Sequence, residues 1–287
     1  MDSTLACLAA WMPRQRWYAA KGRPPSLRLV SWWDLPPAPD DDDGVRIRTF
    51  LVSDEGALPA VLYQIPIVSR ATETVDADPD DVVGSPEPGT TFIDGPHDPA
   101  YARALLRLIT LGGEARGPRV VVNGHPSRHA PDDEPRTASV LTGEQSNTSL
   151  IYRSSGMPII CKVYRQLHPG LNPDIELPTA LADDGSPHVP LAIGWVEGRW
   201  PDPATASGIV TGALASAQRT DVPGAHCRRA GTRSRRIGGS GRRGDDEGGN
   251  GLLPPAAVNA QLRRPTPRLS RNNPIAVSTT TKPSIKP

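Results

Sequence analysis

The 287-residue chain is poor in cysteine and contains no long hydrophobic run. Its cysteines, Cys7, Cys161 and Cys227, lie far apart and form no C-x-x-C pair, which argues against structural zinc and a disulfide framework. No run reaches the roughly eighteen apolar residues of a membrane-spanning helix. Asp2 stands where a signal peptide would carry a basic residue, and Pro13 ends the short apolar stretch after it. We therefore expect a cytoplasmic protein without a membrane partner.

Aromatic residues are also scarce and end at Trp200, so the last third of the chain has none. Charge changes at the same place. Residues 1–200 hold 18 Lys and Arg against 26 Asp and Glu, a net charge of −8, whereas residues 201–287 hold 14 against 5, a net charge of +9. Without large apolar side chains a segment cannot readily offset the entropy cost of ordering. We expect residues 205–287 to form a basic, mostly disordered tail.

The first third of the chain predicts a helix packed on an antiparallel sheet. The predicted elements are a short amphipathic helix at residues 3–12 and strands at residues 26–33, 45–52 and 58–68, the last two joined as a hairpin. The strand at 45–52 alternates apolar and polar residues, as a half-buried strand does. Residues 71–89 are acidic and proline-rich, which predicts a loop. Asp98 followed by Pro99 predicts the start of a helix, and Gly112-Gly113 its end.

A small polar loop separates two β-branched runs after a proline-rich linker predicted at residues 123–136. The loop is Gly143-Glu144-Gln145-Ser146-Asn147-Thr148-Ser149. Its small residues permit tight turns and can present N–H groups and hydroxyls to a phosphate. A loop of this kind, taken alone, is more often an ordinary hairpin turn. Its chemistry therefore depends on the residues that come after it in the chain.

A single lysine, Lys162, lies inside the predicted strand at residues 159–164. That strand is apolar enough to be buried on both faces, where an ammonium group is costly unless it is paired. A helix capped by Asn172, with Pro173 at its start, carries Glu176. Strand, loop, strand with lysine and helix with glutamate come in the same order as in the nucleotide-binding half of protein kinases. The alternative for Lys162 is a strand-edge lysine with its ammonium in solvent.

These motifs resemble those of the actinobacterial maltokinases, which are aminoglycoside-phosphotransferase-like kinases with an N-terminal cap domain. The resemblance covers about residues 5–200 and rests on the loop at 143–149 and on four further strings, at residues 162–165, 172–177, 16–23 and 94–99. It implies an α+β fold. Residues 1–112 would be the cap domain, residues 113–204 a kinase-like N-lobe and residues 205–287 the low-complexity tail.

The resemblance also implies a function, the ATP-dependent phosphorylation of maltose to maltose 1-phosphate in α-glucan and trehalose metabolism. Ser146, Asn147, Thr148 and Ser149 would cradle the phosphates of ATP, Lys162 would hold them, and Glu176 would orient Lys162. Mg²⁺ would accompany ATP, although the sequence offers no ligands for it. The resemblance further implies that the protein works together with trehalose synthase. A related group of enzymes phosphorylates glucosamine, and this alternative stays open.

The sequence departs from the family where catalysis takes place. Neither an H-G-D-type loop nor a D-F-type segment follows Trp200, so no residue is assigned as catalytic base or metal ligand. We expect the chain to be inactive as written, through truncation or a shifted reading frame after about residues 205–225. The alternatives are a non-catalytic nucleotide-binding or cap interaction module and a nucleic-acid binder acting through the basic tail. We do not expect a nucleic-acid partner, because no aromatic residues interleave with the arginines of the tail.

Overall fold

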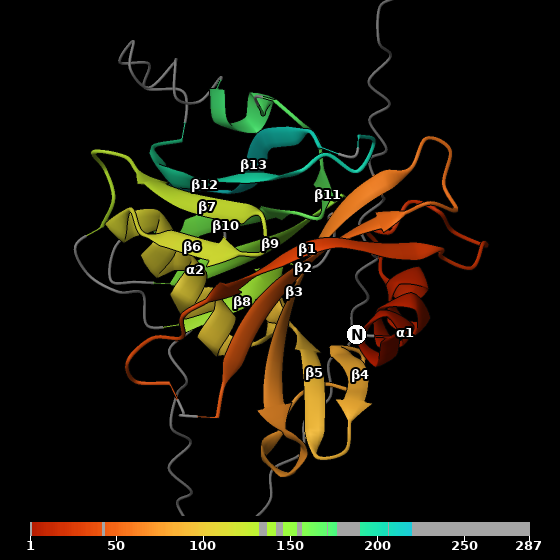
Figure 1. Cartoon of the computed structure of the whole chain (residues 1–287). Coiled ribbons are helices and arrows are strands. Elements are labelled where there is room, and N and C mark those ends of the chain that lie inside the picture. Colours follow the sequence, from red (N-terminus) through yellow and green to blue (C-terminus); the bar gives the residue numbers. More distant parts are fainter. Residues whose placement is uncertain are drawn as a thin grey trace, which may run out of the picture. The chain divides into compact units, whose positions relative to one another are not determined.

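The computed structural model describes residues 2–41, 44–131, 137–141, 146–153, 157–170, 172–176, 190–205 and 207–219. The chain divides into two compact units, residues 1–229 and 230–287, and the described residues all belong to the first. They form two antiparallel sheets accompanied by helices (Figure 1). The mixed helix and antiparallel-sheet class predicted from the sequence is therefore confirmed for this part of the chain.

The first sheet holds the N-terminal strands in the order β1-β2-β3-β5-β4, and β11 pairs with β3. The strands are β1 (Leu27–Leu35), β2 (Arg46–Asp54), β3 (Val61–Ala71), β4 (Val82–Glu87), β5 (Thr90–Asp94) and β11 (Gln166–Leu167). Helix α1 (Asp2–Trp11) and the 3₁₀ turn Met12–Arg14 bury Leu8, Trp11 and Met12 in an aromatic-rich core on this sheet. The predicted N-terminal helix and the β2–β3 hairpin are both confirmed.

The second sheet has the order β6-β7-β12-β13-β10-β9-β8. Its strands are β6 (Glu114–Gly117), β7 (Val120–Pro126), β8 (Thr137–Leu141), β9 (Asn147–Arg153), β10 (Ile159–Tyr164), β12 (Ala192–Pro201) and β13 (Ile209–Arg219). Helix α2 (Pro99–Leu111) packs on β7 and β12. The Tyr152 hydroxyl donates to the Ala102 carbonyl over 2.8 Å, which joins β9 to the same helix.

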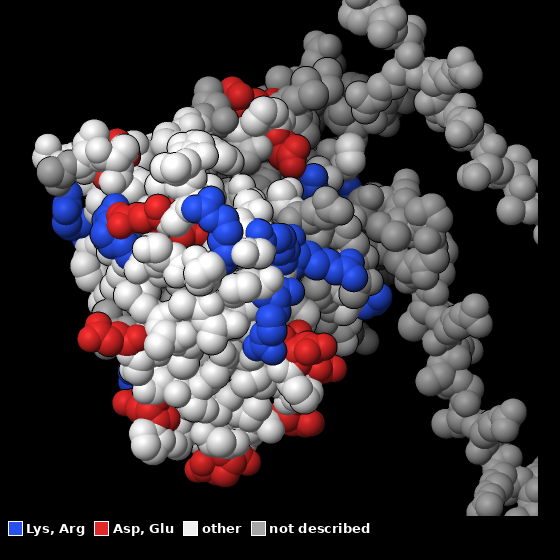
Figure 2. Space-filling view, turned by 90° about the vertical axis from the view of Figure 1, so that its right-hand side faces the viewer, with Lys and Arg blue, Asp and Glu red and all other residues white. Residues whose placement is uncertain are grey.

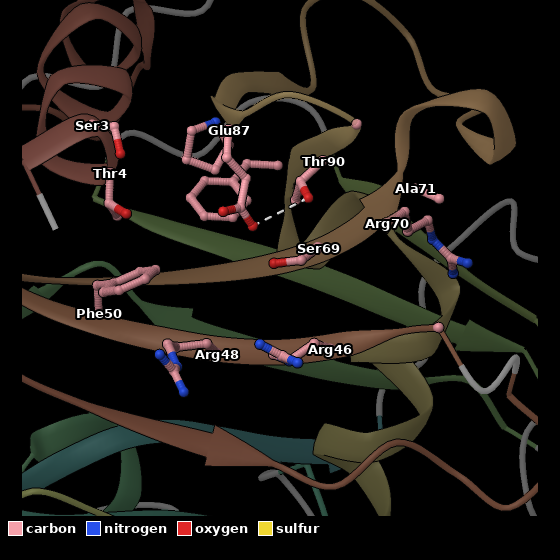
Figure 3. A pocket seen from close by; sticks show the side chains of 14 residues that line it. Ser3, Thr4, Arg46, Arg48, Phe50, Ser69, Arg70, Ala71, Glu87 and Thr90 are labelled. Atoms are coloured by element: carbon pink, nitrogen blue, oxygen red, sulfur yellow. Dashed lines mark hydrogen bonds between the residues drawn. The ribbon is translucent and has the colours of Figure 1, made fainter.

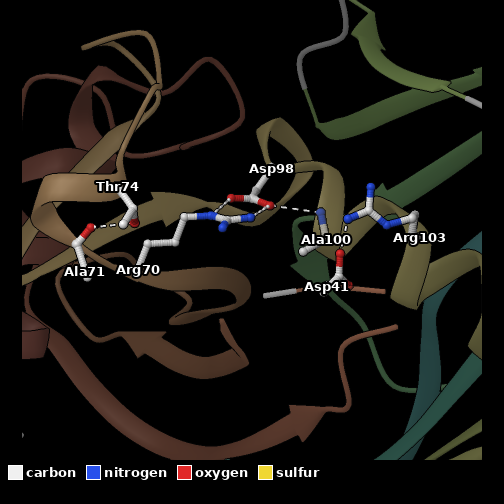
Figure 4. A network of polar contacts seen from close by, with 7 residues as sticks. All are labelled: Asp41, Arg70, Ala71, Thr74, Asp98, Ala100 and Arg103. Atoms are coloured by element: carbon white, nitrogen blue, oxygen red, sulfur yellow. Dashed lines mark hydrogen bonds and ion pairs between the residues drawn. The ribbon is translucent and has the colours of Figure 1, made fainter. Parts of the chain in front are cut away.

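Helix α2 begins and ends where the sequence predicts. Asp98 caps it by accepting a hydrogen bond from the Ala100 N–H, Pro99 occupies the first turn, and Gly112 ends it with a φ of 68°. The same Asp98 carboxylate receives two hydrogen bonds from Arg70 of β3, at 2.7 and 2.9 Å (Figure 4). Arg103 of α2 pairs with Asp41 in the loop after β1. The Arg70–Asp98 and Arg103–Asp41 pairs therefore connect α2 to the first sheet and to one of its loops.

Three predicted loops or tails are strands in the structure. Residues 82–87 of the predicted loop form β4, because α1 packs over it and buries Val83. Residues 123–126 of the predicted linker continue β7, which pairs with β12. Residues 209–219, assigned to the tail, form β13 between β12 and β10, so they belong to the sheet. Residues 220–287 lie outside the described residues.

The two sheets share one apolar core. Leu51 of β2, Leu105 of α2 and Val163 of β10 all belong to the same buried cluster. Because this core covers one face of β2 and the α1 core covers the other, β2 is buried almost throughout its second half, and the predicted half-buried alternation there is wrong. Gln64 of β3 spans the junction, since its amide donates to the Tyr164 and Leu214 carbonyls over 2.7 and 2.6 Å.

Gly124 sets the distance between α2 and β7. A Cβ atom at this position would overlap the Leu108 carbonyl of the helix. We expect Gly124→Ala to lower the free energy of unfolding by about 1–3 kcal/mol or more, because helix and strand must move apart. Gly113→Ala is the control, since its Cβ would lie 3.5 Å from Leu108 Cδ1, an ordinary contact. Urea unfolding measures both, and equal stabilities would contradict the close approach.

Candidate functional site

Lys162 lies on β10, between Ser149 of β9 and Ser216 of β13. Its Nζ donates to the Asp174 Oδ2 over 3.0 Å, and the two side chains are 29% and 46% exposed. The strand alternates, with Cys161 and Val163 toward the core and Lys162 at an intermediate, partly open position. The expectation of a strand buried on both faces is therefore wrong, and the ammonium group is reachable from solvent.

The carboxylate that pairs with Lys162 is Asp174, two residues before the predicted Glu176. Residues 173–176 form a helical turn, capped as predicted by Asn172, whose Oδ1 accepts the Asp174 N–H over 2.9 Å. Two residues along a helix turn the side chain by about 200°. Glu176 therefore projects away from the side that faces β10, and it is exposed.

The predicted phosphate loop is split between a described and an undescribed part. Gly143, Glu144 and Gln145 lie outside the described residues. Ser146 is exposed and Asn147 is half-buried at the start of β9. Thr148 and Ser149 continue the strand with buried side chains. Ser146 and Asn147 are thus the described loop residues with accessible side chains, and the phosphate-binding role of all four stays a prediction.

A buried arginine, Arg165, holds the first residues of β9 in place. Its side chain is fully buried, and its Nη2 donates to both oxygens of Asp94, over 2.8 and 2.6 Å. Its Nε donates to the Thr148 hydroxyl over 2.8 Å, and its guanidinium carbon lies 4.9 Å from the centre of the Trp17 ring. Its Nη1 is buried without a hydrogen-bond partner in the described structure. One guanidinium group therefore joins β5, β9 and the segment after α1.

The sequence motif that contains Arg165 predicts no role for this residue. A signal is nevertheless present, because Arg165 lies between Tyr164 and Leu167 in a run that is otherwise mostly apolar. A charged residue buried in such a run needs an opposite charge nearby. Nothing in the sequence identifies which of the many Asp residues supplies it.

A cavity of about 400 Å³ opens beside this network. Part of its wall comes from the segment before β1 and from residues next to β4 and β5. The rest comes from the end of β8 and the start of β9. Its lining residues are Arg14, Gln15, Arg16, Trp17, Asp80, Asp81, Asp94, His97, Val140, Leu141, Asn147 and Thr148. Burial raises the pKa of the Asp81 carboxyl, and the neighbouring His97 partly offsets this rise.

A second hollow, of about 520 Å³, lies on the first sheet beside the start of α1 (Figure 3). Arg46, Arg48 and Arg70 line it. Figure 2 shows Lys and Arg side chains gathered in a band on the face that carries α1. Arg48 already pairs with Asp34 over 2.6 Å, and Arg70 pairs with Asp98. Two of the three cations in this hollow are thus neutralised within the protein.

Residues 11–98 match the family model of the maltokinase N-terminal cap domain. The match begins at the last residue of α1, covers β1 to β5 and ends at Asp98, the residue that caps α2. This supports the maltokinase-like N-terminus that the sequence motifs implied. Trp17 and Asp94 belong to the matched cap, whereas Thr148 and Arg165 lie after it in the chain. The buried network therefore connects the cap to the strand that carries the predicted phosphate loop.

Among the described residues, no three His, Cys, Asp or Glu side chains gather as ligands for a metal ion. None of the helices in the described part of the chain is both long and apolar enough to cross a membrane.

Removing the carboxylate of Asp94 should destabilise the protein strongly. Asp94→Asn leaves the buried Arg165 charge uncompensated, which costs about 3–5 kcal/mol. The control is Asp34→Asn, whose partner Arg48 is partly exposed, so that the expected cost is about 0–1 kcal/mol. Urea unfolding of both variants measures the difference, and equal losses would contradict the central role given to the buried pair.

Cys161, next to Lys162, should resist thiol reagents in the native protein. Burial raises the pKa of its thiol to about 12, so the reactive thiolate is scarce at about pH 8. Cys7 is only partly buried and serves as the internal comparison. Mass spectrometry after iodoacetamide treatment, in a Cys227→Ser background, should find label on Cys7 first and on Cys161 only in urea. Native labelling of both at equal rates would show that β10 opens readily.

Proposed function

We propose that this chain carries the cap and the nucleotide-binding half of a maltokinase-type sugar kinase. The Lys162–Asp174 ion pair is the observation that carries the proposal. In protein kinases a strand lysine holds the α- and β-phosphates of ATP and is positioned by a helix carboxylate. Here the polar loop, β9, β10 with Lys162 and a helical turn with Asp174 come in that order along the chain.

The proposed nucleotide site lies on the Lys162 face of the second sheet. Ser149 lies directly opposite Lys162 in the β9–β10 ladder, so the strand after the loop runs beside the ammonium group. Ser146 and Asn147 stand at the start of that strand, where loop hydroxyls and N–H groups would meet phosphate oxygens. Asp174 keeps the ammonium oriented toward this space. Mg²⁺ would arrive with ATP, and we assign none of the described residues to it.

The proposed sugar is maltose, because the matched cap domain is that of maltokinases. Glucosamine is the alternative, and a functional link to trehalose synthase remains part of the proposal. The sequence contains no H-G-D loop to accept the proton of the sugar hydroxyl. We therefore propose that the chain binds nucleotide without transferring its phosphoryl group, as a nucleotide-binding module attached to a cap.

Binding of Mg-ATP to the purified chain, measured by calorimetry, tests this proposal. We expect Lys162→Ala to abolish detectable binding, because the phosphates lose their cation. Asp174→Asn should weaken binding about tenfold through loss of a charge-assisted hydrogen bond, whereas Glu176→Gln should leave it within about twofold.

Two outcomes would contradict the proposal. If the unmodified chain does not bind Mg-ATP, the Lys162 site is not a nucleotide site. If Glu176→Gln is as damaging as Asp174→Asn, Asp174 is not the residue that positions Lys162. Transfer of phosphate from ATP to maltose by this chain would overturn the proposal that it binds without turnover.

A further inference from the structure

The structure holds a second candidate ligand site in the cavity beside Arg165, and we propose that it binds a phosphorylated sugar. The cavity, of about 400 Å³, is within the usual range of small-molecule pockets. Its walls combine two arginines, an acidic pair and the start of β9. The inference goes beyond the proposed nucleotide site, because Lys162 does not line this cavity and binding there does not require catalysis.

Lys162 is not among the residues that line this cavity. Thr148, which lines the cavity, pairs with Val163, whereas Lys162 pairs with Ser149. Successive side chains of a strand point to opposite faces, so Thr148 and Lys162 face away from each other. Asn147, which also lines the cavity, shares its face with Ser149 and Lys162. A ligand in the cavity is therefore distinguished from ATP by the absence of Lys162 from the cavity wall.

Arg14 and Arg16 are the two cations that line the cavity. Both are accessible to solvent, and neither has an ion-pair or hydrogen-bond partner for its guanidinium group among the described residues. Two arginines two positions apart, free to converge, present the forked N–H donors that bind phosphate oxygens in pairs.

The cavity also contains acidic groups, which need hydrogen-bond donors as partners. Asp80 and Asp81 line it, and His97 donates from Nδ1 to Asp81 over 2.8 Å. The Asp80 carboxylate accepts no hydrogen bond within the described structure. Carboxylates accept hydrogen bonds from hydroxyls but repel phosphate. A ligand that carries both a phosphate and several hydroxyls satisfies the arginines and the carboxylates together, as a sugar phosphate does.

The aromatic wall argues against a nucleotide in this cavity. Trp17 is only 5% exposed, and its ring lies beside the Arg165 guanidinium. Trp17 therefore offers no open ring face for a base to stack on. Asn147, half-buried at the start of β9, lines the cavity and belongs to the predicted phosphate loop. A ligand here would contact Asn147, and sugar phosphate is also the product class of the proposed kinase.

Calorimetry with the full chain at low salt tests the proposal, with glucose 1-phosphate, inorganic phosphate and Mg-ATP as probes. Glucose 1-phosphate should bind, and more tightly than inorganic phosphate. Arg14→Ala/Arg16→Ala should weaken it at least about tenfold. Arg199→Ala, which removes an exposed arginine of β12 outside the cavity, should leave it unchanged. Asp80→Asn should weaken glucose 1-phosphate but not inorganic phosphate.

The Lys162→Ala variant separates this inference from the proposed function. It should lose Mg-ATP and keep glucose 1-phosphate. Loss of both would place the sugar phosphate at the Lys162 site and overturn the second site. Failure of glucose 1-phosphate to bind at millimolar concentration, or unchanged binding in Arg14→Ala/Arg16→Ala, would overturn it as well. Equal affinity for inorganic phosphate would overturn the assignment to a sugar.

Discussion

The buried charge of Arg165 is the constraint on which the rest of the structure depends. A guanidinium group without water requires an opposite charge and hydrogen-bond acceptors, and three different parts of the chain supply its contacts. Asp94 comes from the end of β5, Thr148 from the start of β9, and Trp17 from the segment after α1. Its carbonyl accepts the Gln64 N–H over 2.9 Å, so its backbone also joins β3. Separating the two sheets would leave this charge unpaired.

The chain passes from one sheet into the other at this group. Residues 166–167, directly after Arg165, pair with β3. The family match for the cap ends at Asp98, yet the core continues across that boundary without a break. The face of β9 and β10 that carries Thr148 and Cys161 is used for this packing, so the other face is the one left for Lys162 and its partner.

Local signals in the sequence were sufficient for several elements. Asp98-Pro99 and Gly112 mark the ends of α2, the β2–β3 hairpin follows from two apolar runs, and Lys162 was placed on its strand. These features depend on neighbours within a few residues, such as a capping carboxylate or a glycine at positive φ. The sequence predicts Glu176 as the partner of Lys162, whereas Asp174 makes the ion pair in the structure, because sequence distance does not specify which side of a single helical turn faces the strand.

Other features were decided by tertiary structure alone. The segment at residues 209–219 is rich in small residues and has little strand signal of its own, but it is a strand because β12 and β10 offer it hydrogen bonds on both edges. β4 pairs with β5 and packs against α1, and neither partner is indicated by a signal in its own residues. The pairing of Arg165 with Asp94 joins residues 71 positions apart, and the cavity beside it is made from both sheets. The sequence by itself determined the local elements and the family resemblance, because these depend on short-range chemistry. Only the packing of the sheets decided which charges meet, because a buried charge selects its partner by distance in space.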